Sequence, residues 1–122
     1  MNQELNSPID LKQLNQISDG DIEFEIEVLQ VYIEDVVERI DKIRKEITTN
    51  DRSQIMREAH HIKGASSNVG AWQIQALAMQ IEKLDQYQLE EATEIIDDML
   101  KKMKAVEQFI EEKSATLSSS CS

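Results

Sequence analysis

The chain has 122 residues, with 13 Lys and Arg against 24 Asp and Glu, so its formal net charge is −11. This length fits one domain, and 40% hydrophobic residues are enough for a packed core and too many for a disordered acidic tail. The acidic balance argues against nucleic acid or an anionic membrane as the partner, since both bind through clustered Lys and Arg.

The beginning of the chain predicts a polar tail followed by one short helix. Three glycines and one proline are too few for the many turns of a strand-rich fold, so we expect helices throughout. Residues 1–8 are expected to be a flexible N-terminus that ends at Pro8. Asp10 is placed to cap a short helix over residues 11–16, and residues 17–20 interrupt it.

The longest periodic stretch begins at Asp21 and ends at Thr48–Asn50. Its apolar side chains alternate between spacings of four and three residues: Ile22, Ile26, Leu29, Ile33, Val36, Ile40, Ile43 and Ile47. This spacing predicts one helix with a single buried face. At 1.5 Å per residue, the helix would be roughly 40 Å long.

Three more helices are expected after this one. Asn50 or Asp51 caps the first of them, and Gly70 ends it. The second has its apolar stripe over residues 74–84 and is followed by a polar turn at 85–88. The last covers residues 92–113.

Together these elements predict an all-α fold. Four helices of about 15–27 residues with short connections form an antiparallel up-down-up-down four-helix bundle over residues 9–113, with a short extra N-terminal helix. The Ser-rich residues 114–122 are expected to be a disordered tail. The apolar stripes could instead pair between chains as a coiled coil, but the short breaks favour closure within one chain, so we expect a monomer.

The segment from Glu58 to Gly70 departs from a plain amphipathic helix. It holds the only two histidines of the chain, His60 and His61. At about 100° per residue, His60 lies at the edge of the apolar stripe, whereas His61 lies on the other side and points to water. The two imidazoles therefore flank the helix and do not face each other, which also prevents both from binding one metal ion.

Gly64 lies one turn after His60, outside the apolar stripe, where the helical pattern does not require a glycine. Glycine inside a helix costs about 1 kcal/mol relative to alanine, and its missing Cβ gives another surface room to approach the imidazole. Lys63 places a cation beside the same ring, and Ser67 continues the same face. We interpret this face as an imidazole that exchanges an anionic group with a partner docked flush against it.

This segment resembles the signature of histidine-containing phosphotransfer (HPt) domains in the residues Ala59-His60-x-Ile62-Lys63-Gly64 and in the later Gly70. HPt domains are four-helix bundles of about this length that shuttle phosphoryl groups in multistep phosphorelays. The resemblance extends from about Ile9 to Lys113. It implies that His60 takes the phosphoryl group and that His61 is the variable position after it.

The resemblance also implies roles for neighbouring residues. Lys63 would lie beside the phosphoryl group, and the partner would dock on Gly64, Ser67, Arg57 and Met56. Position 82 often carries Gln or a similar polar residue in the family, but here it is Glu82. A carboxylate there would repel the phosphate unless it points at the imidazole N–H, in which case Glu82 would orient His60.

The implied partners are response-regulator receiver domains and a hybrid sensor histidine kinase. The receiver carries the aspartyl phosphate and a Mg²⁺ ion, so we expect the chain itself to need no cofactor and no metal. It has no Gly-rich phosphate loop and no His-Glu-x-x-His motif. We therefore expect a phosphocarrier, without autonomous kinase activity, that takes a phosphoryl group from one receiver and passes it to another.

Two other functions are consistent with the residues alone. One is a non-catalytic helical adaptor or dimerising bundle, including an HPt-like domain that has lost phosphotransfer, whose binding would survive replacement of His60. The weaker one is a metal-dependent hydrolase, whose turnover would stop on chelation.

The cellular location is predicted from what the sequence lacks. No apolar run approaches the roughly 18 residues of a membrane span, and the first residues do not resemble a signal peptide. The single cysteine, Cys121, excludes an internal disulfide. We expect a cytoplasmic protein.

Overall fold

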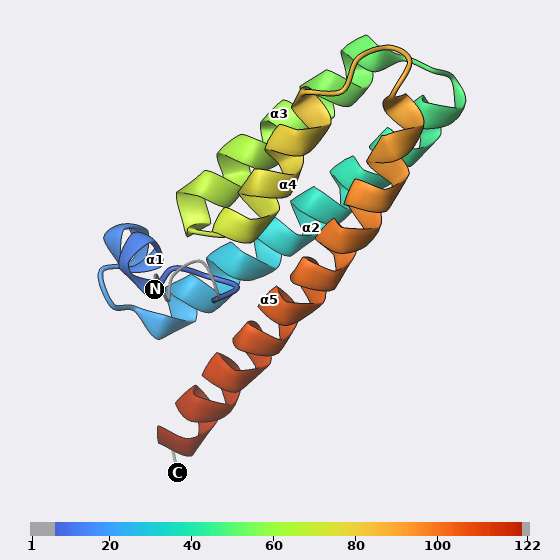
Figure 1. Cartoon of the computed structure of the whole chain (residues 1–122). Coiled ribbons are helices and arrows are strands. Elements are labelled where there is room, and N and C mark those ends of the chain that lie inside the picture. Colours follow the sequence, from blue (N-terminus) through green and yellow to red (C-terminus); the bar gives the residue numbers. More distant parts are fainter. Residues whose placement is uncertain (1–6, 121–122) are drawn as a thin grey trace.

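The computed structural model describes residues 7–120, and every regular element in this range is a helix. The elements are α1 (Leu11–Ser18), α2 (Ile22–Thr48), α3 (Arg52–Val69), α4 (Trp72–Glu82), the short 3₁₀ helix η2 (Leu89–Glu91) and α5 (Ala92–Ser120). Helices α2 to α5 alternate in direction, each packs on the next, and α5 closes the ring against α2 (Figure 1). The predicted all-α bundle is confirmed, with α1 packed on α2 and α3 at one end.

Helix α4 is shorter than expected. It has 11 residues and ends at Glu82, so the length predicted for all four helices is wrong for this one. Leu84, which belonged to its expected stripe, lies after the helix end and is still buried. The chain turns at Asp85, whose carboxylate accepts a hydrogen bond of 2.8 Å from the Tyr87 N–H. Such a side-chain-to-backbone bond favours a turn over a further helical turn.

Helix α5 continues through residues 114–120, where the sequence predicted a disordered tail. No Gly or Pro stops the helix there, and Thr116 Oγ1 donates to the Glu112 carbonyl at 3.0 Å. Ser114 and Leu117 line an open hollow beside the first turns of α2. Residues 121–122 of the expected tail and 1–6 of the expected flexible N-terminus lie outside the described residues.

The core is centred on α2, which contacts both α3 and α5. Leu29, Val36, Ile40 and Ile43 of its predicted stripe are buried. Ile22, Ile26, Ile33 and Ile47 are half-buried at the edge of the core. Tyr32, which the stripe omitted, is buried, and its hydroxyl lies 2.6 Å from Ser66 Oγ. A helix with a neighbour on each side buries a face wider than one row of residues.

Glu46, near the end of α2, gives a pH-dependent prediction. Its Oε1 atom is buried without a hydrogen-bond partner among the described residues, and this burial raises the pKa of Glu46, with further increases from the carboxylates of Glu58 and Asp51. Because the folded pKa is raised, the ionised carboxylate destabilises the fold above that pKa. This destabilisation decreases as the pH falls from the folded pKa of Glu46 toward its unfolded pKa.

Glu46→Gln should therefore raise the free energy of unfolding at pH 7 by about 0.5 kcal/mol, the scale of substitutions at partly exposed positions. The gain should shrink as the pH falls toward the unfolded pKa of a glutamate. Urea unfolding over a pH series measures this effect, with Glu90→Gln, on an exposed side chain, as the control for charge. Equal pH profiles for the two variants would show that burial of Glu46 has no energetic effect.

Candidate functional site

His60 lies near the middle of α3, on the side of the bundle that faces α4. Its side chain is 72% exposed, and its Nδ1 atom lies 3.3 Å from Glu82 Oε2. The other ring nitrogen, Nε2, has no hydrogen-bond partner among the described residues. The imidazole is therefore held at one nitrogen and open to solvent at the other.

Glu82 of α4 contacts two side chains of α3, His60 and Lys63. Its second oxygen, Oε1, is 3.0 Å from Lys63 Nζ, and its side chain is only 25% exposed. A carboxylate can only accept hydrogen bonds, so this contact favours the neutral tautomer of His60 that carries its proton on Nδ1. The lone pair of a neutral imidazole is then on the exposed Nε2. The carboxylate of Glu82 thus lies beside Nδ1 and away from the exposed Nε2.

The expected docking residues share one face of α3 with His60 by helical spacing. Gly64 is exposed, and a Cβ built on it would meet no heavy atom within 4 Å. Arg57 is exposed, whereas Ser67 is half-buried and Met56 is half-buried and packed on the core. Nothing within the described chain therefore requires a glycine at position 64, and the surface around His60 is open.

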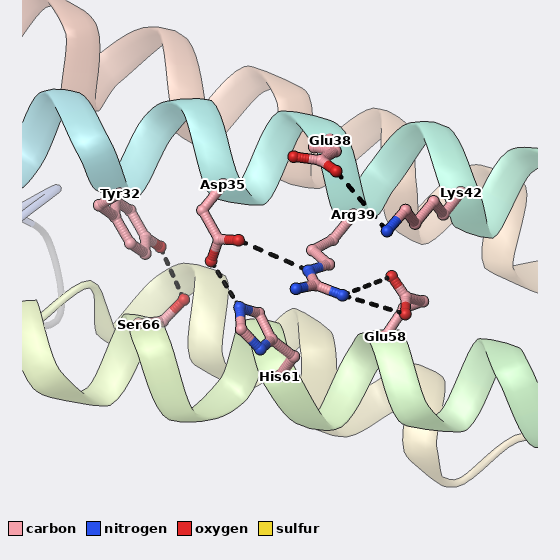
Figure 2. Close-up of polar contacts among 8 residues, drawn as sticks. All are labelled: Tyr32, Asp35, Glu38, Arg39, Lys42, Glu58, His61 and Ser66. Atoms are coloured by element: carbon pink, nitrogen blue, oxygen red, sulfur yellow. Dashed lines mark hydrogen bonds and ion pairs between the residues drawn. The ribbon is translucent and has the colours of Figure 1, made fainter.

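His61 is exposed, as expected, but it also contacts α2. Its side chain is 41% exposed, and its Nε2 atom lies 2.6 Å from Asp35 Oδ2 on α2. Figure 2 shows this contact as part of a row of polar pairs between α2 and α3. Asp35 also accepts from Arg39 Nε at 3.5 Å, and Arg39 Nη1 reaches both carboxylate oxygens of the buried Glu58 at 3.3 Å.

This row of pairs explains why His60 is more exposed than His61. Asp35 holds His61 against α2, and Arg39 and Glu58 add a second attachment between the same two helices (Figure 2). Adjacent residues on a helix point about 100° apart, so fixing His61 toward α2 turns His60 away from it. These contacts were missed in the sequence because each joins residues on different helices, and the spacing within one helix carries no signal for them.

A row of apolar residues on α2 leads to the histidine pair. Phe24, Val28 and Val31 are followed, at helical spacing, by Asp35, which contacts His61. Phe24 is 43% exposed and Val31 is 64% exposed. Large exposed apolar side chains in one row mark a surface that a partner can cover.

Within residues 7–120, no group of three or more His, Cys, Asp or Glu side chains is arranged to hold a metal ion. None of the helices described has a stretch long and apolar enough to span a bilayer.

The sequence and the fold match one family. Residues 27–114 match the family model of the Hpt domain, and the chain therefore belongs to the HPt domain family. Histidine-containing phosphotransfer protein 2 of Arabidopsis thaliana is 36% identical over 73 residues, which cover 57% of this chain and 46% of that protein. The chain thus spans about half the length of the curated relative that it matches.

Two solved structures share the fold. Histidine-containing phosphotransfer protein B of Pseudomonas aeruginosa has a TM-score of 0.76 at 21% identity, covering 88% of this chain and 96% of that one. The HPT domain of a hybrid sensor histidine kinase from Shewanella has a TM-score of 0.67 at 19% identity, covering 94% and 97%. Helix α1 and the first turn of α2 precede the range matched by the family model.

Proposed function

We propose that this protein is a histidine phosphotransfer protein of a multistep phosphorelay, which accepts a phosphoryl group from the aspartate of one receiver domain on His60 and passes it to another. The observation that carries the proposal is the placement of His60 in a member of the HPt family. Its Nε2 atom is open to a partner, while its Nδ1 atom is held by Glu82.

The transfer to His60 is a displacement at phosphorus. The Nε2 lone pair attacks the phosphorus of the aspartyl phosphate in line, the P–N bond forms, and the P–O bond breaks as the aspartate carboxylate leaves. The Nδ1 proton stays in place, so positive charge develops on the imidazole as the bond forms. The Glu82 carboxylate faces that charge and stabilises it.

Lys63 binds the phosphoryl group after transfer. In the free protein its ammonium group lies 3.0 Å from Glu82, on the same face of α3 as the imidazole. Its flexible side chain lets the ammonium turn from Glu82 to the phosphoryl oxygens once these arrive. The receiver brings the Mg²⁺ ion and most of the electrostatic catalysis, and this chain brings a positioned nucleophile.

The receiver docks on the face of α3 around Gly64, with Ser67, Arg57 and Met56 beside it. The apolar row of α2 extends this surface. The chain acts as a monomer, because helices α2 to α5 pack around one shared core in a closed ring. It is a carrier without kinase activity of its own, because no Gly-rich phosphate loop occurs in the sequence.

Two substitutions of Gly64 test receiver docking and protein stability separately. Gly64→Ala should raise the free energy of unfolding by about 1 kcal/mol, because the added methyl group meets open space and alanine is the better helix former. Gly64→Leu should also fold, but its side chain should block the approach of the receiver and slow transfer at least about tenfold. Urea unfolding and transfer rates measure the two effects. An unchanged transfer rate for Gly64→Leu would contradict the role of clearance.

The proposed function is tested by offering two phosphoryl donors. The purified chain is mixed with a phosphorylated receiver domain and Mg²⁺, and in a parallel reaction with ATP and Mg²⁺ alone. Acid-labile, alkali-stable label should reach the chain from the receiver and not from ATP. Label from ATP alone would contradict the carrier function, and receivers that bind without transferring label would favour the adaptor.

A further inference from the structure

Two open hollows follow one another along the seam between α2 and α5. Ile33 and Ile110 line the first, and Ile26 and Leu117 line the second. The residues in each helix are seven apart, so the two pairs fall at matching positions of antiparallel helices. They form one apolar floor that extends over about 10 Å. We call this surface the α2–α5 groove.

Acidic side chains line both edges of the α2–α5 groove. The edges carry five glutamates, three from α2 and two from α5: Glu23, Glu27, Glu34, Glu107 and Glu111. None of the five forms an ion pair or a side-chain hydrogen bond within residues 7–120. An apolar floor between two rows of available carboxylates is complementary to a segment with one apolar face and flanking cations.

We propose that the α2–α5 groove binds a cationic amphipathic helix of a partner protein. The apolar side chains of that helix lie on the floor, and its Lys or Arg side chains reach the glutamates on the two edges. The rim on α2 extends from Glu23 to Glu34, about 17 Å, which matches a helix of about 11 residues. This proposal does not depend on the phosphorelay function of His60.

The charge of the groove excludes other occupants. A second copy of this chain would place glutamates opposite glutamates, and an anionic membrane or a nucleic acid would be repelled in the same way. Residues 1–6 and 121–122 contain no Lys or Arg, so neither of these two segments supplies the cations. A separate protein with a basic helix is the occupant that fits.

The groove leaves the histidine face free. In the ring of helices, α2 pairs with α5 on one side, and α3 pairs with α4 on the opposite side. His60 and Glu82 belong to the α3–α4 pair. A helix in the α2–α5 groove therefore leaves the imidazole of His60 accessible.

The test uses a synthetic amphipathic helix of 14 residues, made of Leu on one face and Lys on the other. It is titrated into the full, ¹⁵N-labelled chain at 0.15 M salt and followed by NMR. The backbone shift changes should centre on the α2–α5 groove. The triple variant E27Q/E34Q/E111Q should weaken binding by about tenfold, and Leu117→Ala should weaken it by about threefold, since charge and apolar contact both contribute.

The matched control is D41N/E90Q/D97N, which changes the net charge by the same amount at exposed positions outside the groove. It should weaken binding by less than about twofold. Equal losses in the two triple variants would overturn the proposal, because binding would then follow net charge alone. Shift changes centred on His60, or no binding by the wild type at 0.15 M salt, would also overturn it.

Discussion

Replacement of His60 by Gln should abolish phosphoryl acceptance while the bundle stays folded. The side chain is 72% exposed, so little packing is lost, and the free energy of unfolding should stay within about 0.5 kcal/mol of the wild type. Glutamine keeps a polar side chain of similar length, but an amide nitrogen has no basic lone pair with which to attack phosphorus. Transfer of label from a phosphorylated receiver, measured beside thermal unfolding, separates the two effects.

The neighbouring histidine provides the matched control. His61→Ala removes the contact with Asp35, and since both side chains are partly exposed, the loss of stability should be about 0.5–1 kcal/mol. Transfer should persist, because His60 and Glu82 are untouched. Loss of transfer in His61→Ala, with His60 present, would contradict the choice of nucleophile.

Gly70→Ala should lower the free energy of unfolding by about 2–4 kcal/mol, the largest effect on stability that we expect from one methyl group. Gly70 ends α3 with φ at +75°, where its N–H bonds to the carbonyls of Ser66 and Ser67. A Cβ there would lie 2.9 Å from both the carbonyl oxygen and the Cβ atom of Asp10. The substituted residue would be strained, and it would push the chain before α1 away from α3.

That chain segment is anchored at the same corner. The Asp10 N–H donates to the Gly70 carbonyl at 2.9 Å, and the Asp10 carboxylate accepts from Trp72 Nε1 at 2.8 Å and from the Lys12 N–H at 3.0 Å. The bond from Trp72 lowers the pKa of Asp10, because it favours the ionised form, although burial opposes it. Displacement of Asp10 would therefore disturb three hydrogen bonds at once.

The two glycines of α3 form an internal comparison. Alanine should stabilise the protein at Gly64, in open space with helical backbone, and destabilise it at Gly70, with positive φ and a close neighbour. Urea unfolding of the two variants under one set of conditions measures both changes. Changes of the same sign would contradict the explanation given for at least one of these positions.

Features that depend on neighbouring residues could be predicted from the sequence. Asp10 and Asp51 cap α1 and α3 as expected, each accepting a backbone N–H two or three residues later. Gly70 ends α3 as expected. The apolar spacing also predicted a bundle of antiparallel helices, because each signal lies within one helix or at its end.

Features that depend on how two helices meet were not visible in the sequence. The contacts of His61 with Asp35 and of Tyr32 with Ser66 join α2 to α3, and the rotation of each helix about its axis decides them. The extension of α5 beyond Lys113 was also not indicated by the sequence. The contact between Glu82 and His60 also joins two helices. The sequence alone could not decide whether the Glu82 carboxylate points at the imidazole.

The central claim is tested most directly by locating the phosphoryl group. The ¹⁵N-labelled chain is phosphorylated by a receiver domain, and the ring nitrogens of both histidines are then followed by NMR at alkaline pH. We expect a single modified nitrogen, Nε2 of His60, because Nδ1 faces Glu82. A phosphoryl group on His61, or on a carboxylate or hydroxyl while both imidazoles stay unmodified, would contradict the account.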